Sequence, residues 1–558
     1  MLATTWSADK ALAVARRCHF WQWRSWLLLS AYYLMTLFNA VLDGLSMVAL
    51  VQLFVQPSIT SNPLQALLQE GLQTLGVEVS LINLLWLTVA LFVIRVGLYF
   101  LLLWLQDMMR VWIRRDLQNG LFTGLMKAQW AHLRQLQTGR NVVTLTEEVM
   151  TTSRYFLAVL RSGYFLLTSC VLVLMALWIN ASLTLFLGSV LLPVVLAMRG
   201  LFVWQARLSL KMTRIRQRLA ADMTEHLHNL FQIKTEVSPL PHIRRGLRHQ
   251  PEFVRLESKV AWLQALIAAA ILLLPAIALL AFMAWVKWQA VPAEQLMAVL
   301  ASIGVLGARI SVQVNGLMAS VGTLTRFSGS LLAVYNLLNI PPVVVRPLIE
   351  KPVDGVRVEH VSYQYDGQGG VVDIHLQVSK GVPLWVNGTS GSGKSTLANL
   401  LAGLVLPQAG HVLYLSEGSS YDVRHYQAKV GYVTQDVFLY QGSVRDNLDM
   451  SGDYTDAVLW RALEESEASV FVKQLGGLDS QLLEAGRSLS GGQKRRLGIA
   501  RVLLACPDIL ILDEVTAGLD GVSRSAIEGL VAQLANDKVV VLITHDAVRI
   551  TVQELLLD

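Results

Sequence analysis

The sequence predicts a membrane domain of six transmembrane helices followed by an α/β domain that carries a phosphate-binding loop. The composition is the first observation: 54% of the 558 residues are hydrophobic and only 15% are charged, which is too apolar for a typical soluble chain. In addition, six long apolar segments lie in about the first 325 residues, and the run NGTSGSGKST at 387–396 joins a strand pattern to a helix pattern. We therefore expect a membrane domain over residues 1–335, a linker over 336–354 and the α/β domain over 355–558.

The six apolar segments each meet or exceed the roughly 20 residues that a helix needs to cross a bilayer. Lys and Arg are absent from 56–83, whereas 108–154 and 204–259 are rich in both. The positive-inside rule therefore places both termini and the two basic loops in the cytoplasm. The first segment has no small-residue cleavage site, so we expect it to remain as an anchor. The segments lie near 25–55, 82–107, 155–178, 182–203, 260–286 and 294–322.

The two basic loops have helical periodicity of their own. Apolar residues recur at three-and-four spacing in 114–136 and 218–237, which predicts that the spanning helices continue past the membrane surface. Amphipathic helices lying on the lipid would show the same pattern. The net charge of +6 is spread around the spans, so we expect no nucleic-acid partner. Cys18, Cys170 and Cys506 have no metal-binding spacing and indicate no disulfide framework.

The run at 387–396 has the pattern of a loop that wraps around phosphates. A strand is predicted over 382–386 and a helix over 397–404, with the spacing Gly-x₄-Gly-Lys-Ser between them. Backbone N–H groups and the helix N-terminus would hold the phosphates, with Lys394 reaching the β- and γ-phosphates and Ser395 binding Mg²⁺. The flanking strand and helix disfavour the alternative of an unrelated Gly-rich linker. The predicted binding residues are Gly388, Ser390, Gly391, Gly393, Lys394, Ser395 and Thr396.

Two further motifs in the α/β domain fit the same chemistry. The apolar strand ILILDE at 509–514 ends in Asp513, which can hold the Mg²⁺ shell, and Glu514, which can polarise an attacking water. LSGGQKRR at 489–496 is a second Gly-containing turn that leads into a helix and can bind another phosphate. One nucleotide cannot easily fill two phosphate-binding turns about a hundred residues apart. Two copies of the domain facing head to tail would fill both.

In chain order, these motifs resemble those of an ATP-binding cassette (ABC) exporter half-transporter, which joins six spans to a nucleotide-binding domain. The resemblance also rests on YQYDG, VTQD, AGLD and ITHD in the same domain. It implies that ATP and Mg²⁺ bind and that ATP hydrolysis is coupled to transport. The residues it assigns are Tyr365 on adenine, Ser490, Gly491, Gly492 and Gln493 in the signature, Asp520 in the D-loop, Gln435, Glu514 and His545 in catalysis, and Ser395, Gln435 and Asp513 on Mg²⁺.

The resemblance extends to the membrane half, with some departures elsewhere. TGRNVVTLTEEV at 138–149 and LFQIKTEV at 230–237 are similar to the family's two intracellular loops, whose short coupling helices dock on the nucleotide domains. The D-loop has Ala517 and Gly518 where exporters usually have Ser-Ala, and Val515 follows the glutamate. The chain stops at TVQELLLD, where relatives continue through another hairpin and a terminal helix.

The resemblance implies a dimer in a bacterial inner membrane that moves an amphipathic substrate by alternating access. A complete set of motifs in one chain makes a homodimer sufficient. Non-transport ATPases with the same nucleotide domain lack six spans, whereas a regulatory or channel-like member remains an alternative. The expected substrate is a peptide, which would arrive already processed because no peptidase domain precedes the first span. The stretch at 39–57 is also similar to exporters that flip lipid-linked sugars, which keeps a lipid or saccharide flippase as the rival.

Four ionisable residues interrupt the predicted spans. Charges at this depth are costly and usually face an interior cavity. Three positive charges and one negative charge would make that cavity cationic and favour amphipathic anions. The alternative is an Asp–Arg pair that fixes helix packing, with an arginine that snorkels to the surface. The residues are Asp43, Arg95, Arg161 and Arg309.

Overall fold

The chain divides into two compact units. The first comprises Met1–Ala128 and His132–Pro342, and the second comprises Gln129–Ala131 and Val343–Asp558. Most of the predicted loop at 56–83 lies outside the residues that this computed structural model describes. The described residues are 9–14, 16, 23–52, 81–133, 138–179, 181–236, 238–289, 293–365, 369–483, 486–517, 521–546 and 548–557.

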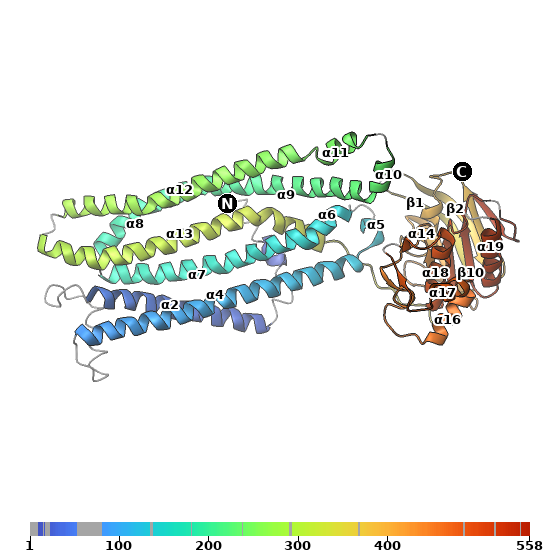
Figure 1. The fold of residues 1–558 in the computed structure, drawn as a ribbon, viewed down its shortest axis with the longest axis horizontal. Helices are drawn as coiled ribbons and strands as arrows, with labels where there is room; N and C mark the ends of the chain where they lie inside the picture. The colour runs from blue at the N-terminus through green and yellow to red at the C-terminus, as the bar shows by residue number, and fades with distance from the viewer. Residues whose placement is uncertain are drawn as a thin grey trace. The chain divides into compact units, whose positions relative to one another are not determined.

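The first unit is a bundle of long helices that run side by side (Figure 1). Six of the described helices are long and apolar enough to cross a membrane, which confirms the six predicted spans. Large apolar side chains on their outer faces are exposed, such as Trp86 at 66%, Phe100 at 70% and Leu272 at 76%, as expected where lipid replaces water. The long helices are α2 (Trp23–Gln52), α4 (Leu81–Met126), α7 (Val149–Ile179), α8 (Ala181–Ala197), α9 (Arg199–His228), α12 (Gln250–Trp288) and α13 (Ala293–Leu338).

Several helices extend well past their apolar runs, as the sequence predicts. Helices α4 and α13 have 46 residues each, so at 1.5 Å per residue each is about 69 Å long, roughly twice the thickness of the hydrocarbon core. The two segments that resemble coupling loops contain short helices, α6 with the adjoining π-helix η2 and α10. The short helices are α5 (Trp130–Leu133), α6 (Thr138–Val143), η2 (Thr144–Glu148), α10 (Leu230–Thr235) and α11 (Leu240–Gly246).

Helix α13 connects the two parts of the bundle core. On one side Leu331 packs with Leu117 of α4 and Tyr155 of α7 in a single buried cluster. On the other side Met318 packs with residues of α9 and α12, including Leu263. Helix α13 therefore packs against α4 and α7 on one side and against α9 and α12 on the other. A shift of α13 would change the packing of all four helices.

The second unit contains a four-stranded sheet, a five-stranded sheet and a short two-stranded sheet of β7 and β8. An antiparallel sheet has the order β2-β1-β4-β5, and a parallel sheet has the order β11-β3-β10-β9-β6. The strands are β1 (Gly355–Gln364), β2 (Gly370–Ser379), β3 (Leu384–Gly388), β4 (Ala409–Ser416), β5 (Ser419–Asp422), β6 (Val430–Val433), β7 (Gly442–Ser443), β8 (Gln481–Leu482), β9 (Ile509–Asp513), β10 (Val539–Ile543) and β11 (Gln553–Leu557). The helices are α14 (Lys394–Leu401), α15 (Val444–Leu448), α16 (Asp456–Glu465), α17 (Ser469–Leu475), α18 (Gly491–Leu504) and α19 (Gly521–Ala535).

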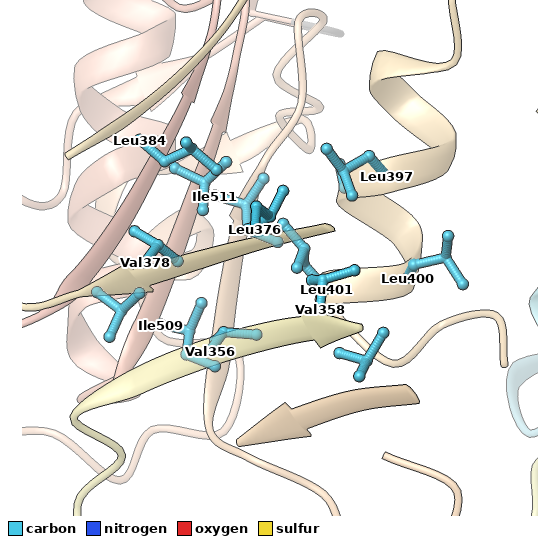
Figure 2. Packing of buried hydrophobic residues seen from close by; sticks show 14 of the residues in the cluster. Val356, Val358, Leu376, Val378, Leu384, Leu397, Leu400, Leu401, Ile509 and Ile511 are labelled. Carbon is cyan, nitrogen blue, oxygen red and sulfur yellow. The ribbon is translucent and has the colours of Figure 1, made fainter. Parts of the chain in front are cut away.

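The core between the sheets fixes the start of α14. Figure 2 shows side chains of β1 and β2 gathered with those of β3, β9 and α14, and all of them belong to one buried cluster. Leu397, Leu400 and Leu401 of α14 are each at most 1% exposed. Strand β10, and strand β9 up to Asp513, are apolar because elements cover both faces of a parallel sheet. The loop before α14 is therefore held between a buried strand and a buried helix.

Candidate nucleotide site

The predicted phosphate-binding loop connects β3 directly to α14. Gly391 and Gly393 have φ of +92° and +98°, in the left-handed region that favours glycine. A Cβ atom at Gly393 would also clash with the carbonyl oxygen of Gly370, so no larger residue fits there. These features curl the backbone tightly at the N-terminus of α14, which is the geometry that holds phosphate groups.

The side chains of this loop present a cation and hydroxyl groups. Lys394 is 7% exposed, and its ammonium group donates hydrogen bonds to the carbonyl oxygens of Gly388 and Thr389, each at 2.8 Å. The hydroxyl of Ser392 is buried and has no hydrogen-bond partner among the described residues. Ser395 is exposed in the first turn of α14. An unpaired buried hydroxyl beside a buried cation and a helix N-terminus fits the oxygens of a polyphosphate.

The strand order places the other predicted catalytic residues at one edge of the parallel sheet. Strands β6, β9 and β10 are neighbours, and Gln435, Glu514 and His545 follow their carboxyl ends. The amide of Gln435 donates to Glu514 Oε2 at 2.5 Å, and His545 Nε2 lies 3.2 Å from Glu514 Oε1. The structure thus brings these three residues together at the edge where open parallel sheets bind their ligands.

Glu514 has an unusual backbone conformation. Its φ is +51°, which is uncommon for a residue other than glycine. Its backbone N–H donates to the carbonyl oxygen of Ile543 on the neighbouring strand at 2.8 Å, which holds the residue in place. Backbone strain of this kind is concentrated at functional sites, where it directs a side chain.

Asp513 lies at the end of β9 in a partly buried position. Burial raises the pKa of Asp513, whereas a 3.0 Å hydrogen bond from the hydroxyl of Tyr432 and the positive charge of Lys394 act in the opposite direction. A nearby cation would therefore favour the ionised carboxylate. Mg²⁺ is commonly held by one or two carboxylates together with substrate phosphates.

No group of three or more His, Cys, Asp and Glu side chains in the described part of the chain could hold a metal ion alone. The carboxylate of Asp513 and the hydroxyl of Ser395 are oxygen ligands of the kind that Mg²⁺ takes together with phosphate oxygens. Ser395, Gln435 and Asp513 are the side chains that would hold it, and the bound ion would neutralise charge on the phosphates.

The predicted signature forms the start of α18. Ser490 Oγ accepts a hydrogen bond from the N–H of Gln493 at 3.3 Å, and Gln493 Oε1 accepts one from the N–H of Ser490 at 2.9 Å. Gly491 and Gly492 lie between the two residues of this reciprocal capping box, in the first turn of a 14-residue helix. The signature is therefore a second helix N-terminus at which an anion would be favoured.

Two remaining predicted residues lie at the margins of what the structure describes. Tyr365 is half-buried after β1, with its ring edge-on to that of Tyr363 at 4.8 Å between centroids. Its hydroxyl accepts a long hydrogen bond of 3.5 Å from Asn399 of α14, so it lies beside the helix that follows the phosphate loop. Asp520 and Gly518 of the predicted D-loop lie outside the described residues.

The structure also shows supporting residues that the sequence did not indicate. Tyr432 orients Asp513, and the buried hydroxyls of Thr516 and Thr544 lie 2.9 Å apart, joining the loops after β9 and β10. The indole N–H of Trp385 donates to the carbonyl oxygen of Thr544 at 3.1 Å. The available signal was weak, because these are ordinary residues at strand ends. Their supporting role follows from hydrogen bonds between neighbouring strands, which the sequence alone does not show.

Comparisons with known proteins identify similar proteins for both units. A family model described as ABC transporter matches residues 371–517. The protein exp8 of Streptococcus pneumoniae, named as an ABC transporter ATP-binding protein, is 26% identical over 457 residues, which cover 78% of this chain and 76% of that protein. A multidrug resistance ABC transporter ATP-binding and permease protein of Lactococcus lactis is 35% identical over 193 residues, about a third of each chain (33% and 32%).

A solved structure extends the likeness of fold over both units. It is a bacterial Atm1-family ABC exporter with ATP bound, similar with a TM-score of 0.80 over 95% of this chain and 94% of the other, at 20% identity. Six spans joined to an ATPase unit of this kind define a membrane-bound P-loop ATPase. Residues 371–517 form an ABC transporter ATPase domain, and the whole chain has the fold of an ABC exporter half-transporter; it hydrolyses ATP and couples that hydrolysis to transport.

The four ionisable residues predicted within the spans separate into two groups. Arg95 Nη2 lies 3.0 Å from Asp43 Oδ1, and Arg309 Nε lies 3.8 Å from the same oxygen. These three side chains connect α2, α4 and α13 around a carboxylate that is 2% exposed. Arg161 makes a different contact, donating from Nε to Gln106 Oε1 at 3.2 Å. The first group has the geometry of the packing alternative, in which an Asp–Arg pair joins helices.

We expect Asp43→Asn to destabilise the membrane unit, because it leaves Arg95 and Arg309 without their carboxylate. Removing one partner of a buried pair costs about 3–5 kcal/mol. The arginine side chains are 18% and 29% exposed, so we expect a smaller loss of about 1–3 kcal/mol. Thermal unfolding of the purified protein, followed by intrinsic tryptophan fluorescence, should show a midpoint several degrees lower.

Asp107→Asn is the matched control on the next span. Its carboxylate is 54% exposed and pairs with Arg110 on the same helix at 3.3 Å. Exposed pairs of this kind contribute about 0.3–0.5 kcal/mol, so the control should unfold near the wild-type midpoint. Equal midpoints for Asp43→Asn and Asp107→Asn would show that the Asp43 group does not stabilise the bundle.

Proposed function

We propose that this protein works as a homodimer and exports an amphipathic substrate across the bacterial inner membrane. A peptide is the favoured substrate. The observation that carries the proposal is the convergence of Gln435, Glu514 and His545 on one edge of the sheet in a chain with six spans. The loops rich in Lys and Arg are expected to lie in the cytoplasm. Both termini and the nucleotide domain would lie on the same side of the spans as these loops and would therefore also be cytoplasmic.

In this proposal, ATP is hydrolysed between two copies of the nucleotide domain. The phosphate loop and Lys394 of one copy hold the phosphates, and the helix N-terminus at Ser490 of the other copy covers them. Glu514 orients the attacking water and His545 stabilises charge on the transferred phosphate, which is catalysis by positioning and electrostatics. A complete set of these residues in one chain supports two identical composite sites. Tyr365 would stack on the adenine ring.

Closure of the nucleotide domains on ATP would then change which side of the membrane unit is open. The short helices α6 and α10, in the segments similar to coupling loops, are the elements proposed to transmit this motion. ATP binds the closed state better than the open state, so binding and hydrolysis shift the population between the two. Helix α13 packs against both halves of the bundle and would carry the shift across it.

The test uses the full-length protein in proteoliposomes with its nucleotide domains outward. We expect MgATP to drive accumulation of a labelled amphipathic peptide above its external concentration, and Glu514→Gln to abolish the accumulation. A parallel assay follows a labelled lipid-linked sugar, whose movement in place of the peptide would favour the flippase alternative. ATP turnover without uphill movement of either molecule would contradict export and favour a regulatory or channel-like role.

A further inference from the structure

A cavity of about 680 Å³ lies within the membrane unit, between α4, α7 and α13. A volume of this size is typical of sites for drug-sized ligands. The cavity begins where the apolar run of α4 ends: Tyr99 and Leu103 line one part of it, and Gln106 and Arg110 line the part further along the helix. It therefore has an apolar portion and a polar portion.

The polar portion of the cavity has an excess of positive charge. Three arginines line it, Arg110, Arg154 and Arg161, but only one carboxylate, Asp107. Arg110 Nη2 lies 3.3 Å from Asp107 Oδ1, so that carboxylate is already paired. Within the described ranges, neither Arg154 nor Arg161 forms an ion pair with any carboxylate, although Arg161 donates a hydrogen bond to Gln106.

The two unpaired arginines share one face of a helix. Arg154 and Arg161 are seven residues apart on α7, which is almost two helical turns. Asp43 cannot neutralise them, since its carboxylate is engaged by Arg95 and Arg309. Both side chains are exposed, so a bound molecule can reach them, and a charge such as Arg161 within a predicted span usually faces an interior cavity.

The apolar portion is built from aromatic and aliphatic side chains. Tyr164 and Phe165 of α7 meet edge to face at 5.2 Å between ring centroids, and Phe327 of α13 also lines the cavity. A bound molecule could place an apolar body against these rings while its charged end lies near the arginines. This division of the lining matches an amphipathic molecule rather than a uniformly polar one.

We propose that this cavity binds the anionic end of an amphipathic substrate, with a carboxylate or phosphate group held by Arg154 and Arg161 on α7. The proposal rests on the proposed function, because it assigns the cavity to the transport pathway. The anion would make charge-assisted hydrogen bonds to the guanidinium groups, which can hold carboxylate and phosphate with two parallel bonds. Ser320 and Thr323 also line the cavity; their hydroxyls donate to carbonyl oxygens of their own helix and could accept a hydrogen bond from a peptide N–H.

Binding is tested on the full-length protein in phosphatidylcholine nanodiscs without nucleotide. The probe is a fluorescent, N-acetylated apolar peptide, used either with a free terminal carboxylate or as the terminal amide. We expect the carboxylate form to bind about tenfold or more tightly, the difference made by one charge-assisted hydrogen bond. Dodecyl phosphate, with dodecyl maltoside as its neutral match, is the second arm and tests phosphate as the source of the anion.

Variants of the two arginines test whether the anion binds at this position in the cavity. Arg154→Gln and Arg161→Gln should each weaken the anion preference about tenfold, and Arg161→Lys should restore part of it because the charge returns. Arg115→Gln is the control, since Arg115 is 70% exposed on α4 and does not line the cavity. Size-exclusion profiles like that of the wild type show that the variants remain folded.

The outcomes separate the binding site from the export function. Arginine-dependent preference for the anion in either arm supports the proposal and identifies carboxylate or phosphate as the source. Equal binding of anionic and neutral probes, or a preference that survives Arg154→Gln with Arg161→Gln, overturns it. The binding assay contains no ATP and therefore does not depend on transport. A failure to accumulate peptide in the separate proteoliposome assay would contradict export but not the binding site.

Discussion

Glu514→Gln should leave ATP binding near the wild-type level and lower ATP hydrolysis by about 10²–10⁴-fold, the range typical of a lost general base. Glutamine keeps the size of the side chain and can still hydrogen bond to Gln435 and His545, which contact Glu514 at 2.5 and 3.2 Å. Only the negative charge that orients water is lost. Phosphate release by the purified protein measures turnover, and equilibrium binding of a fluorescent ATP analogue measures affinity.

Glu467→Gln is a matched control for that experiment. Glu467 has φ of +57°, close to the +51° of Glu514, and its side chain is exposed in the loop between α16 and α17. The same chemical change at a similar backbone conformation should leave hydrolysis unaltered. Near-normal hydrolysis by Glu514→Gln would rule out the role assigned to this carboxylate.

Lys394→Ala should weaken ATP binding itself, by about 10–100-fold. Lys394 is 7% exposed, and its ammonium group donates to the carbonyl oxygens of Gly388 and Thr389 in the phosphate loop. A hydrogen bond from a charged donor contributes about 1.5–3 kcal/mol, and each 1.4 kcal/mol is a factor of ten in affinity. Titration with the same ATP analogue provides the measurement, and turnover should fall with occupancy.

The control for Lys394→Ala is Lys429→Ala, which removes an exposed lysine from the same domain. We expect its ATP affinity to match the wild type. The contrast with Glu514→Gln is informative because one variant loses binding and the other loses turnover. Wild-type ATP affinity in Lys394→Ala would contradict the assignment of this lysine to the phosphates.

The membrane unit could be predicted because the features that indicate it extend over long stretches of sequence. Apolar runs of more than twenty residues and the asymmetry of Lys and Arg between loops do not depend on contacts between distant residues. The continuation of α4 to Met126 also followed from local periodicity. What periodicity could not supply was the pairing of Asp43 with Arg95 and Arg309 and the separate position of Arg161, since both depend on how the helices rotate against one another.

The nucleotide site was predictable at the level of residue type. The glycine spacing of the phosphate loop and the carboxylates after β9 carry their chemistry in the local sequence. The contacts of Glu514 with Gln435 and His545 depend instead on β6, β9 and β10 being neighbours, which chain order does not reveal. The same strand order brings Tyr432 to Asp513, so that partner was invisible in the sequence.

The proposed mechanism depends on the phosphate loop of one copy meeting the signature of another. Cross-linking tests this directly, because it distinguishes a contact between chains from one within a chain. Two differently tagged chains are co-expressed, one with Ser390→Cys in the phosphate loop and one with Ser488→Cys just before the signature. Both carry Glu514→Gln to retain ATP and have Cys18, Cys170 and Cys506 replaced by serine.

A bismaleimide long enough to cross a bound nucleotide is then added with and without MgATP. We predict a product that carries both tags, strongly increased by MgATP and absent when either cysteine is omitted. A third chain carrying both cysteines, expressed alone and diluted, reports linkage within one chain. If that chain links internally while the two-tag product never forms, the composite site between two copies is contradicted.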